Sequence, residues 1–383
     1  MQSRYLTYTT LLFLFIISYS ETIVLFGIKL AYPIKAIFWL FSVFLLLFKR
    51  YSSTKLEEKS CINIMFLLLI LILIDVIRWD LDSALEIMRW ITFPATIILF
   101  YNNRHKKDSY FLFRFYILLV TFFCFIDSYI WNRELSGFEL MSGAELNMHP
   151  YYFHTPHQAS LSLSFLFFSY VIASNKSDNS NKLIDIPIML MLIYLIITTG
   201  VRLGLVPAFI LLVYMSIFKS KKKDVLVNMT VLIGAVASIF LISGISDRLF
   251  DKTVTGSFDS RESDQIIASG RPYIWKAYYE MIFHSFDFVS LLFGFGYTKM
   301  LNLIESNLNW RVLPHNGVLQ IFYTHGLIGI ASMFAIHKRM FGIFSKNKIL
   351  GIGFLIFSGM NILFQLLPYG IDFAVAAILV NEN

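Results

Sequence analysis

The sequence is poor in charged residues. Only 15% of its 383 residues are Asp, Glu, Lys or Arg, whereas a soluble globular chain has about 25%. Hydrophobic residues make up 57% and aromatic residues 17%, including 39 Phe and 20 Tyr, which is more than one soluble core needs. These proportions exclude an ordinary soluble domain and indicate a polytopic membrane protein.

Cysteine is also scarce, and no low-complexity tract or internal repeat is evident. The two cysteines, Cys61 and Cys124, both lie in apolar segments. We expect them to be small buried residues, so no disulfide framework is implied. The net charge of +7 falls in short clusters between apolar runs, which is typical of membrane topology signals rather than of nucleic-acid binding.

Apolar runs recur along the whole chain. A spanning helix needs about 17–25 mainly apolar residues. The N-terminal MQSRYLTYTTLLFLFIISYS resembles a signal peptide but lacks a clear small-residue cleavage site, so we interpret it as the first transmembrane helix. The twelve predicted spans are residues 7–25, 31–48, 61–77, 85–101, 110–130, 158–174, 183–200, 203–218, 225–243, 314–336, 349–367 and 368–381.

Basic clusters determine the predicted orientation. They fall at residues 49–59, 102–108, 174–182, 219–224 and 337–348. All of them lie on one side of a twelve-span arrangement, and an excess of Lys and Arg marks cytoplasmic loops. The sequence therefore predicts an all-α, multi-pass bundle of twelve transmembrane helices with both termini in the cytoplasm.

Two longer segments are expected on the opposite face, at roughly 131–157 and 244–313. The second is too short for a large soluble domain but long enough for a few helices lying over the membrane. Residues 271–286 read as one such helix, with Pro272 in the first turn, where proline is favoured.

Three residues on this outer face carry the predicted chemistry. Arg202 lies in a short turn between two spans and Arg271 opens the loop helix. His315 opens the span 314–336 in LPHNGVLQIFYTHGLIGI. Guanidinium groups and helix N-termini bind phosphate, so the set predicts a phosphate or pyrophosphate site. The alternative is that the arginines are membrane-edge anchors and His315 an interfacial polar residue.

The helix that follows His315 is expected to pack closely. In a continuous helix, Gly326 and Gly329 lie on the same side as His315, where small residues let neighbouring membrane helices approach. His325 would then lie about 15 Å deeper than His315, as a buried and hydrogen-bonded residue.

Four motifs follow one another in a fixed order: TTGVRLG, GRPYIWKAYYEMI, LLFGFGYT and HNGVLQIFYTHGLIG. Together they resemble the O-antigen ligase and polymerase superfamily of bacterial envelope polysaccharide synthesis. The resemblance covers roughly residues 183–336. We therefore divide the chain into N-terminal transmembrane helices, residues 1–182, and a ligase/polymerase-like region, residues 183–383, which includes the periplasmic loop 244–313.

The resemblance implies a membrane glycosyltransferase of the bacterial inner membrane, acting at its periplasmic face on undecaprenyl-pyrophosphate-linked oligosaccharide, without metal or cofactor. Arg202 and Arg271 stand at the family's arginines and would bind the pyrophosphate. His315 stands at the family's histidine and would assist the acceptor hydroxyl. The chain has Val201 where the family has a serine. Membrane lipids, a flippase and a chain-length regulator are the other expected partners; nucleic acid is not.

Further residues are expected to contact the sugar. Asn316 follows the histidine, and Tyr151 and Tyr152 offer aromatic faces within HPYYFHTPHQ. The alternative for the tyrosines is an aromatic belt at the membrane interface.

A competing constellation is RWDLDSALEIMRW, which contains Asp80 and Asp82, with Glu86 and Arg89 beyond them. Two neighbouring carboxylates can bind a divalent metal. We favour charge pairing of this acidic group with Arg78 and Arg89, or with other outward-facing cations, because charges at a membrane edge usually find partners.

The preferred function is polymerisation of lipid-linked repeat units. An O-antigen ligase, which moves the finished glycan onto a lipid A core, has the same motifs and remains an alternative. A transporter or flippase is the alternative from another class, because Asp75, Asp127 and Asp372 lie within predicted spans.

The charge pattern predicts that loop 244–313 is outside and the Lys221–Lys223 cluster is inside. A single cysteine at position 222 should therefore resist a membrane-impermeant thiol reagent in intact cells, while cysteines in loop 244–313 react. Labelling of Lys222→Cys from outside would disprove the topology and the site with it.

Overall fold

The computed structural model describes the membrane bundle and part of the outer segment. The described residues are 2–19, 24–25, 28–48, 56–103, 109–129, 151, 153, 155–177, 180–199, 201, 204, 207, 271–308, 313–364 and 369–382. Two predicted spans, 203–218 and 225–243, lie outside the described residues except for two isolated positions, as do residues 244–270 of the outer loop.

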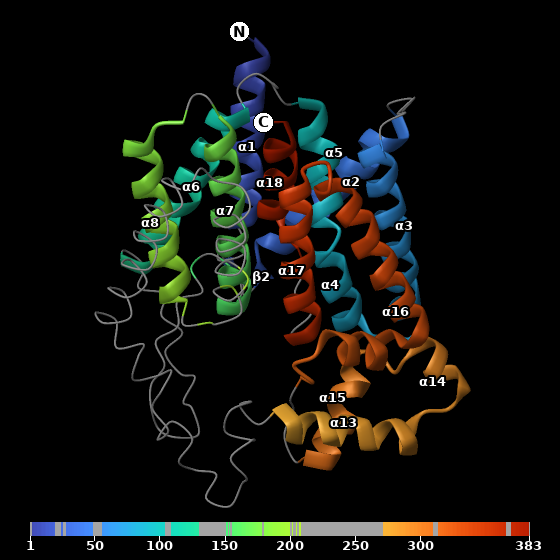
Figure 1. The fold of residues 1–383 in the computed structure, drawn as a ribbon. Coiled ribbons are helices and arrows are strands. Elements are labelled where there is room, and N and C mark those ends of the chain that lie inside the picture. The colour runs from blue at the N-terminus through green and yellow to red at the C-terminus, as the bar shows by residue number, and fades with distance from the viewer. Residues whose placement is uncertain are drawn as a thin grey trace, which may run out of the picture.

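The described part of the chain is almost entirely helical (Figure 1). Two antiparallel strands of two residues each, β1 (Val24–Leu25) and β2 (Ile28–Lys29), lie between the first two helices. The bundle consists of α1 (Gln2–Tyr19), α2 (Ala31–Phe48), α3 (Leu56–Ile77), α4 (Leu81–Arg89), α5 (Thr92–Asn103), α6 (Ser109–Tyr129), α7 (Pro156–Lys176), α8 (Lys182–Thr198), α16 (Gly317–Phe344), α17 (Lys348–Phe364) and α18 (Ile371–Glu382). The outer segment contains α13 (Arg271–Ser285), α14 (Phe288–Phe293) and α15 (Tyr297–Leu308).

The all-α prediction is confirmed. Of the ten predicted spans within the described residues, nine each overlap one helix, whereas residues 85–101 are divided between α4 and α5. By length and composition, four segments of the described residues can cross a membrane: Lys59–Ile77, Leu81–Phe100, Ser109–Ser128 and Gly317–Phe344. These four spans make the protein a multi-pass membrane protein. The other apolar helices within the described residues are shorter, so the count of twelve spans stays a prediction.

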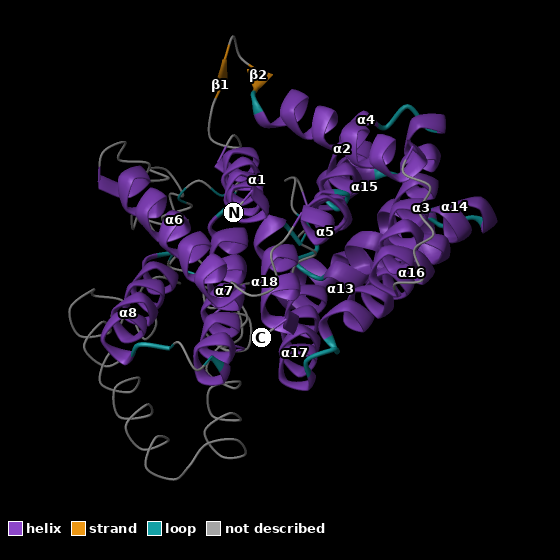
Figure 2. Ribbon diagram, turned by 90° about the horizontal axis from the view of Figure 1, so that it is seen from above, coloured by secondary structure: helices purple, strands orange, loops and turns teal. Residues whose placement is uncertain are grey.

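Helix α18 forms the centre of the bundle. All residues from 371 to 380 are buried, and Figure 2 shows α1, α5, α7 and α17 around it. Small side chains at Ala374, Ala376 and Ala377 allow this close approach, as is common for helices packed in membranes.

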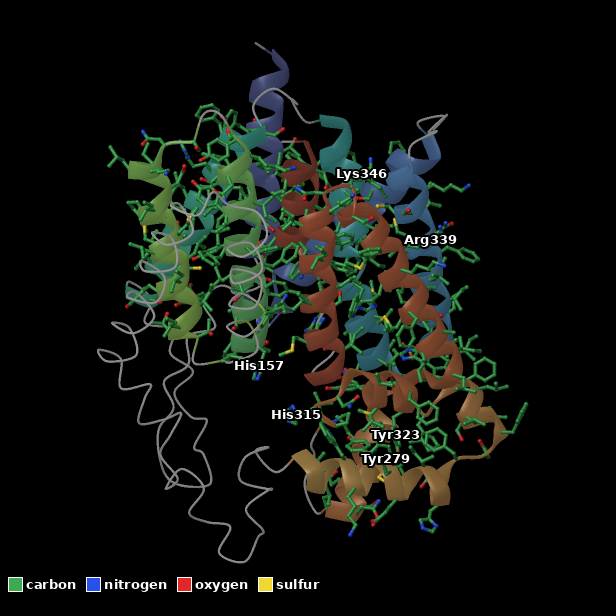
Figure 3. All side chains as sticks on the ribbon, in the orientation of Figure 1. His157, Tyr279, His315, Tyr323, Arg339 and Lys346 are labelled. Carbon is green, nitrogen blue, oxygen red and sulfur yellow. The ribbon has the colours of Figure 1, made fainter. Side chains whose placement is uncertain are left out.

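The two chain ends lie at the same end of the bundle, opposite α13 and α15 (Figure 1). The basic residues Arg339 and Lys346 lie in the half of the molecule that holds the chain ends (Figure 3). This arrangement agrees with the predicted separation of basic loops from the 244–313 loop. Which face is cytoplasmic remains a prediction from the charge pattern.

The expectation of one continuous helix at 314–336 is wrong, because α16 breaks at Gly326. This residue has φ 64° and ψ −153°, a conformation that is essentially restricted to glycine. A Cβ atom there would lie 2.5 Å from the Leu292 carbonyl group and 2.6 Å from the Gly294 nitrogen. The chain therefore turns, and α16 has a first arm, residues 317–325, and a second arm, residues 327–344.

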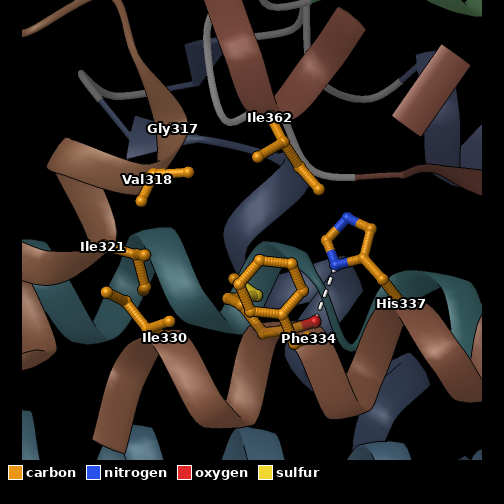
Figure 4. Close-up of a pocket in the computed structure, with 8 residues that line it drawn as sticks. Gly317, Val318, Ile321, Ile330, Phe334, His337 and Ile362 are labelled. Carbon is orange, nitrogen blue, oxygen red and sulfur yellow. Dashed lines mark hydrogen bonds between the residues drawn. The ribbon is translucent and has the colours of Figure 1, made fainter. Parts of the chain in front are cut away.

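The first arm folds back on the second, so that Ile321 and Ile330 line one pocket (Figure 4). A Cβ at Gly329 would lie 3.0 Å from the Ile321 oxygen and 2.4 Å from the His325 Cβ. Gly329 thus permits a close approach within α16 itself. The expected common face running from His315 through Gly326, and the depth of 15 Å for His325, do not apply, because both assumed a straight axis.

The first arm and α13 to α15 form a cap with its own apolar core. This core comprises Ile274, Tyr278, Met281, Met300, Ile304, Leu319 and Tyr323. The Tyr323 hydroxyl donates to the Tyr278 carbonyl, and the two rings meet edge-on at 5.0 Å. Burial raises the pKa of the Tyr278 hydroxyl, which favours its neutral form further.

Gly326→Ala should destabilise the protein by more than about 2 kcal/mol, because it combines a forbidden backbone conformation with backbone contacts that cannot move. Gly342→Ala is the matched control. Gly342 is in the same helix, and a Cβ there meets nothing within 4 Å. Thermal unfolding of both variants in detergent measures the difference. Equal stabilities would show that the break does not need glycine.

Candidate functional site

His315 lies just before the first arm of α16 rather than in it. Its φ is 47°, in the left-handed region that non-glycine residues seldom adopt. Asn316 is the N-cap: its side-chain oxygen accepts from the backbone nitrogens of Val318 at 3.0 Å and Leu319 at 3.1 Å. The expectation that His315 opens the helix is corrected by two residues, since the helix begins at Gly317.

This placement separates the roles of the two neighbours. The Asn316 side-chain oxygen is engaged in capping, which is a structural use of a residue that we expected to contact substrate. His315 is partly exposed and lies at the edge of the cap (Figure 3). Strained backbone at a functional group is a recurrent feature of active sites.

Helix α13 holds the residue before His315. The Trp275 indole nitrogen donates to the Pro314 carbonyl at 2.6 Å. Arg271 is the first residue of α13, one turn before Trp275 on the same side of the helix. The helix that begins at Arg271 is thus attached to the His315 loop, and the side chain of Arg271 is outside the described residues.

Arg202 also lies outside the described residues, but both sides of its turn are fixed to α7. The Ser160 hydroxyl donates to the Val201 carbonyl at 3.1 Å and accepts from the Gly204 nitrogen at 3.2 Å. A Cβ at Gly204 would lie 2.3 Å from the Ser160 carbonyl oxygen, so glycine is needed there. His157, one turn before Ser160, lies at the cap-facing end of α7 (Figure 3).

One of the two tyrosines expected to bind sugar, Tyr151, is buried inside the protein. Tyr151 is only 2% exposed, and its hydroxyl donates to the Leu195 carbonyl at 3.0 Å and hydrogen-bonds Thr198. It attaches its segment to α8, so we leave it out of the proposed substrate contacts. Tyr152 lies outside the described residues.

His325 is buried, as expected, and belongs to a polar cluster at the helix break. Its Nε2 lies 2.9 Å from the Asp75 Oδ2, and its Nδ1 lies 2.9 Å from the Thr324 hydroxyl. Asp75 is fully buried near the end of α3. The pair thus attaches the end of the first arm to the bundle.

Arg78 caps the broken helix end. Its Nη1 donates to the Thr324 carbonyl at 3.0 Å and its Nη2 to the Phe293 carbonyl at 2.6 Å. The GFG segment, residues 294–296, supplies two more donors. The Phe295 nitrogen donates to the Tyr323 carbonyl at 2.6 Å, and the Gly296 nitrogen donates to the Thr324 carbonyl at 3.0 Å. These donors satisfy carbonyls that a helix end leaves without partners.

Asp80 completes the junction between bundle and cap. It accepts from the Thr298 nitrogen at 3.0 Å and hydroxyl at 3.1 Å, and it caps α4 through the Ser83 nitrogen at 3.1 Å. A Cβ at Gly296 would lie 2.4 Å from the Asp80 carboxylate. This close approach explains the second glycine of GFG.

The expected charge pairing is therefore only partly confirmed. Glu86 does bind Arg89 at 2.6 Å, but Asp80 binds Thr298, and Arg78 binds backbone carbonyls. Burial lowers the pKa of Arg78, against the opposing effect of Asp75 and Asp80. Among the residues that the structure describes, no group of three or more His, Cys, Asp or Glu is placed to hold a metal.

The sequence analysis did not predict that residues 78–80, Arg-Trp-Asp, attach the cap to the bundle. The available signal was the position of Arg78 and Asp80 at the two ends of the three-residue link between α3 and α4. In so short a turn, Arg78 and Asp80 bind the neighbouring cap and do not serve as membrane-edge anchors.

The fold and the site together define a multi-pass membrane protein with a helical cap that presents a histidine at its edge. Residues 187–334 match the O-antigen ligase family. This part of the chain is thus an O-antigen ligase family domain, as the ordered motifs predicted. The match runs from α8 into the second arm of α16 and includes the whole described cap. No curated protein matches the chain.

The His325–Asp75 pair predicts a coupled loss of stability. His325→Ala should lower the free energy of unfolding by about 3 kcal/mol, because it leaves a buried carboxylate without its partner. The double variant His325→Ala/Asp75→Leu should lose less than the sum of the two single variants. Additive losses, measured by unfolding in detergent, would exclude an energetic coupling between the two side chains.

Proposed function

We propose that the protein is a polysaccharide polymerase that joins undecaprenyl-pyrophosphate-linked oligosaccharide repeat units at the periplasmic face of the bacterial inner membrane. The observation that carries this proposal is the coincidence of the O-antigen ligase family match with the cap, because the matched residues 187–334 include the loop that holds His315. The Trp275–Pro314 hydrogen bond, which attaches the helix that begins at Arg271 to that loop, supports the proposal as well.

The proposed reaction transfers a glycan from one carrier to another. The acceptor hydroxyl oxygen attacks the anomeric carbon of the donor sugar, and the bond from that carbon to the pyrophosphate oxygen breaks. The leaving pyrophosphate takes the bonding electron pair, and His315 takes the proton of the acceptor hydroxyl. Histidine suits this step because its pKa lies near neutral pH in the absence of perturbation.

Arg202 and Arg271 are proposed to bind the pyrophosphate. The leaving group carries the charge that develops in the transition state, and fixed cations stabilise such charge. Arginine binds phosphate oxygens with two parallel hydrogen bonds, which lysine cannot do. The Ser160 contacts on either side of Arg202 support this role, since they hold the backbone of its turn in place.

A ligase that transfers the glycan to a lipid A core would use the same groups with a different acceptor, and the described contacts do not discriminate between acceptors. A transporter receives less support. Two of the carboxylates that favoured it are engaged within the protein, Asp75 with His325 at 2.9 Å and Asp372 with the Tyr116 hydroxyl at 2.7 Å.

Deletion of the gene followed by gel electrophoresis of the surface polysaccharide tests the function. A polymerase predicts cores that carry a single repeat unit, a ligase predicts uncapped cores, and a flippase predicts neither repeat units outside nor polymer. Restoration of long chains by the wild-type protein is the control. Uncapped cores in the deletion strain would exclude the polymerase.

Arg202→Lys and Arg271→Lys should each reduce polymer formation about 10–100-fold, which corresponds to the loss of one charge-assisted hydrogen bond. Complementation of the deletion strain measures the effect, with protein amounts compared by immunoblot. Arg339→Lys is the control, because Arg339 lies toward the opposite end of the bundle (Figure 3). Full-length polymer from both site variants would reject the pyrophosphate role.

His315→Ala should reduce the rate by about 10²–10⁴-fold, the usual contribution of a positioned base. The amount of folded protein should change little, because His315 is partly exposed and lies outside the helix. Activity at matched protein levels is the measurement. A variant that retains normal activity would mean that the acceptor proton leaves by another route.

A further inference from the structure

Large apolar side chains are exposed where the cap meets the bundle. Phe288 and Val289, the first two residues of α14, are 73% and 63% exposed. Trp79, in the link between α3 and α4, is 88% exposed. Apolar surface that is left open beside polar surface usually marks a place where a protein contacts a partner or a membrane.

The lipid-facing side of α3 leads to this place. The span Lys59–Ile77 is only 33% buried inside the protein. Its exposed apolar residues recur every three or four positions, as one face of a helix requires: Ile62, Phe66, Leu69, Leu73, Val76 and Ile77. In a membrane helix such a face contacts lipid chains. Trp79 follows directly, so it lies at the boundary between lipid chains and headgroups, where tryptophan is enriched.

The backbone of the link turns Trp79 away from the protein. Its two neighbours bind inward, Arg78 to the Thr324 carbonyl at 3.0 Å and Asp80 to the Thr298 nitrogen at 3.0 Å. Trp79 has φ 58°, which non-glycine residues seldom adopt. The ring is therefore presented outward, and an indole with an apolar body and one N–H suits a membrane interface.

Helix α14 is held at the same level. Gly294 ends α14, and a Cβ there would lie 2.4 Å from the His325 nitrogen. The His325 ring in turn binds Asp75 near the end of the α3 span. Figure 1 and Figure 2 both show α14 beside the cap-side end of α3. The six residues of α14 advance about 9 Å along the axis, which is comparable with the headgroup layer of about 5–8 Å in each leaflet.

Other sides of the cap are charged. Asp287 caps α14 and accepts from the Ser290 nitrogen at 2.7 Å, and hydrogen bonds from the Ser290 hydroxyl and nitrogen hold the pKa of Asp287 below its usual range. On α13, exposed Lys276 and Glu280 pair at 4.0 Å. An apolar edge next to charged faces is the pattern of elements that lie at the headgroup boundary of a membrane.

We propose that Trp79, Phe288 and Val289 form a membrane-contact edge, which inserts into the headgroup layer beneath the cap and attaches the cap to the lipid surface. Lipid is the occupant because this edge continues the lipid-facing side of α3 at the end of the span. The proposal does not depend on the reaction proposed above, since none of the three residues belongs to the His315 loop or to the α7 turn.

Spin labels at the edge test the proposal. The purified full-length protein, with Cys61→Ala and Cys124→Ala, carries one nitroxide at Phe288→Cys or Val289→Cys in phospholipid nanodiscs. Electron paramagnetic resonance then compares collisions with oxygen, which concentrates in lipid, and with a water-soluble nickel complex. Leu69→Cys on α3 is the lipid reference. Ser306→Cys, at an exposed position of α15, is the water reference.

Nickel collisions at 288 and 289 should be about tenfold rarer than at 306, because polar solutes are excluded from apolar surroundings, and oxygen collisions should be more frequent. Nickel collisions as frequent as at 306 would overturn the proposal. A label shielded from both reagents would overturn the lipid assignment in favour of a contact with a second copy of the chain.

A charge at the edge should release it from the membrane. With the label at Val289→Cys, Phe288→Asp should raise nickel collisions at least about fivefold, because a charge replaces an apolar anchor. Tyr279→Asp is the matched control, because Tyr279 is exposed on α13 next to Lys276 and Glu280 (Figure 3), and it should leave the collisions unchanged. An unchanged rate in Phe288→Asp, or an equal rise in both variants, would overturn the role of Phe288.

Discussion

The attachment of the cap depends above all on one interaction, the pair of hydrogen bonds from Arg78 to the carbonyls of Thr324 and Phe293. One guanidinium joins three parts of the chain: the end of α3, the end of α14 and the broken end of α16. Its planar group with several fixed donors suits this task, whereas lysine presents a single ammonium. Asp75 and Asp80, which flank Arg78 in the sequence, bind His325 of α16 and Thr298 of α15.

The physical constraint behind this junction is the cost of an unpaired backbone carbonyl away from water. A helix that stops inside the protein must satisfy its final carbonyls through other parts of the chain. Here the Phe295 and Gly296 nitrogens bond the Tyr323 and Thr324 carbonyls, and glycine at 294 and 296 is needed because side chains would overlap the partners. The break at Gly326 is therefore stabilised by residues distant in sequence. It turns the first arm outward so that its N-terminus, with Asn316 and His315, lies at the edge of the cap.

Local signals were enough to predict some elements and not others. The apolar run 31–48 gave the bounds of α2 directly, since membrane helices are defined by hydropathy over one window. The same criterion concealed the break in 314–336, because the sequence stays apolar across Gly326 and the cause of the turn is contact with Leu292 and Gly294. The N-cap role of Asn316 was accessible from propensity, but treating the segment as a single span obscured it. The structural role of Tyr151 depends on its hydrogen bonds to α8, and no local sequence pattern reveals contacts between distant segments.

The two outer loops of the proposed site share a principle of construction. Neighbouring elements hold their backbones: Trp275 binds the Pro314 carbonyl before His315, and Ser160 binds Val201 and Gly204 around position 202. Backbone attachment fixes a loop while the side chain between the attachments keeps its chemical role, and preorganised groups stabilise a transition state without reorganisation. The serine that the family places before its arginine, replaced here by Val201, is therefore not needed to hold the turn, because the Ser160 hydroxyl already bonds both of its flanks. The departure at position 201 changes a side chain of the turn and leaves its anchoring to α7 in place.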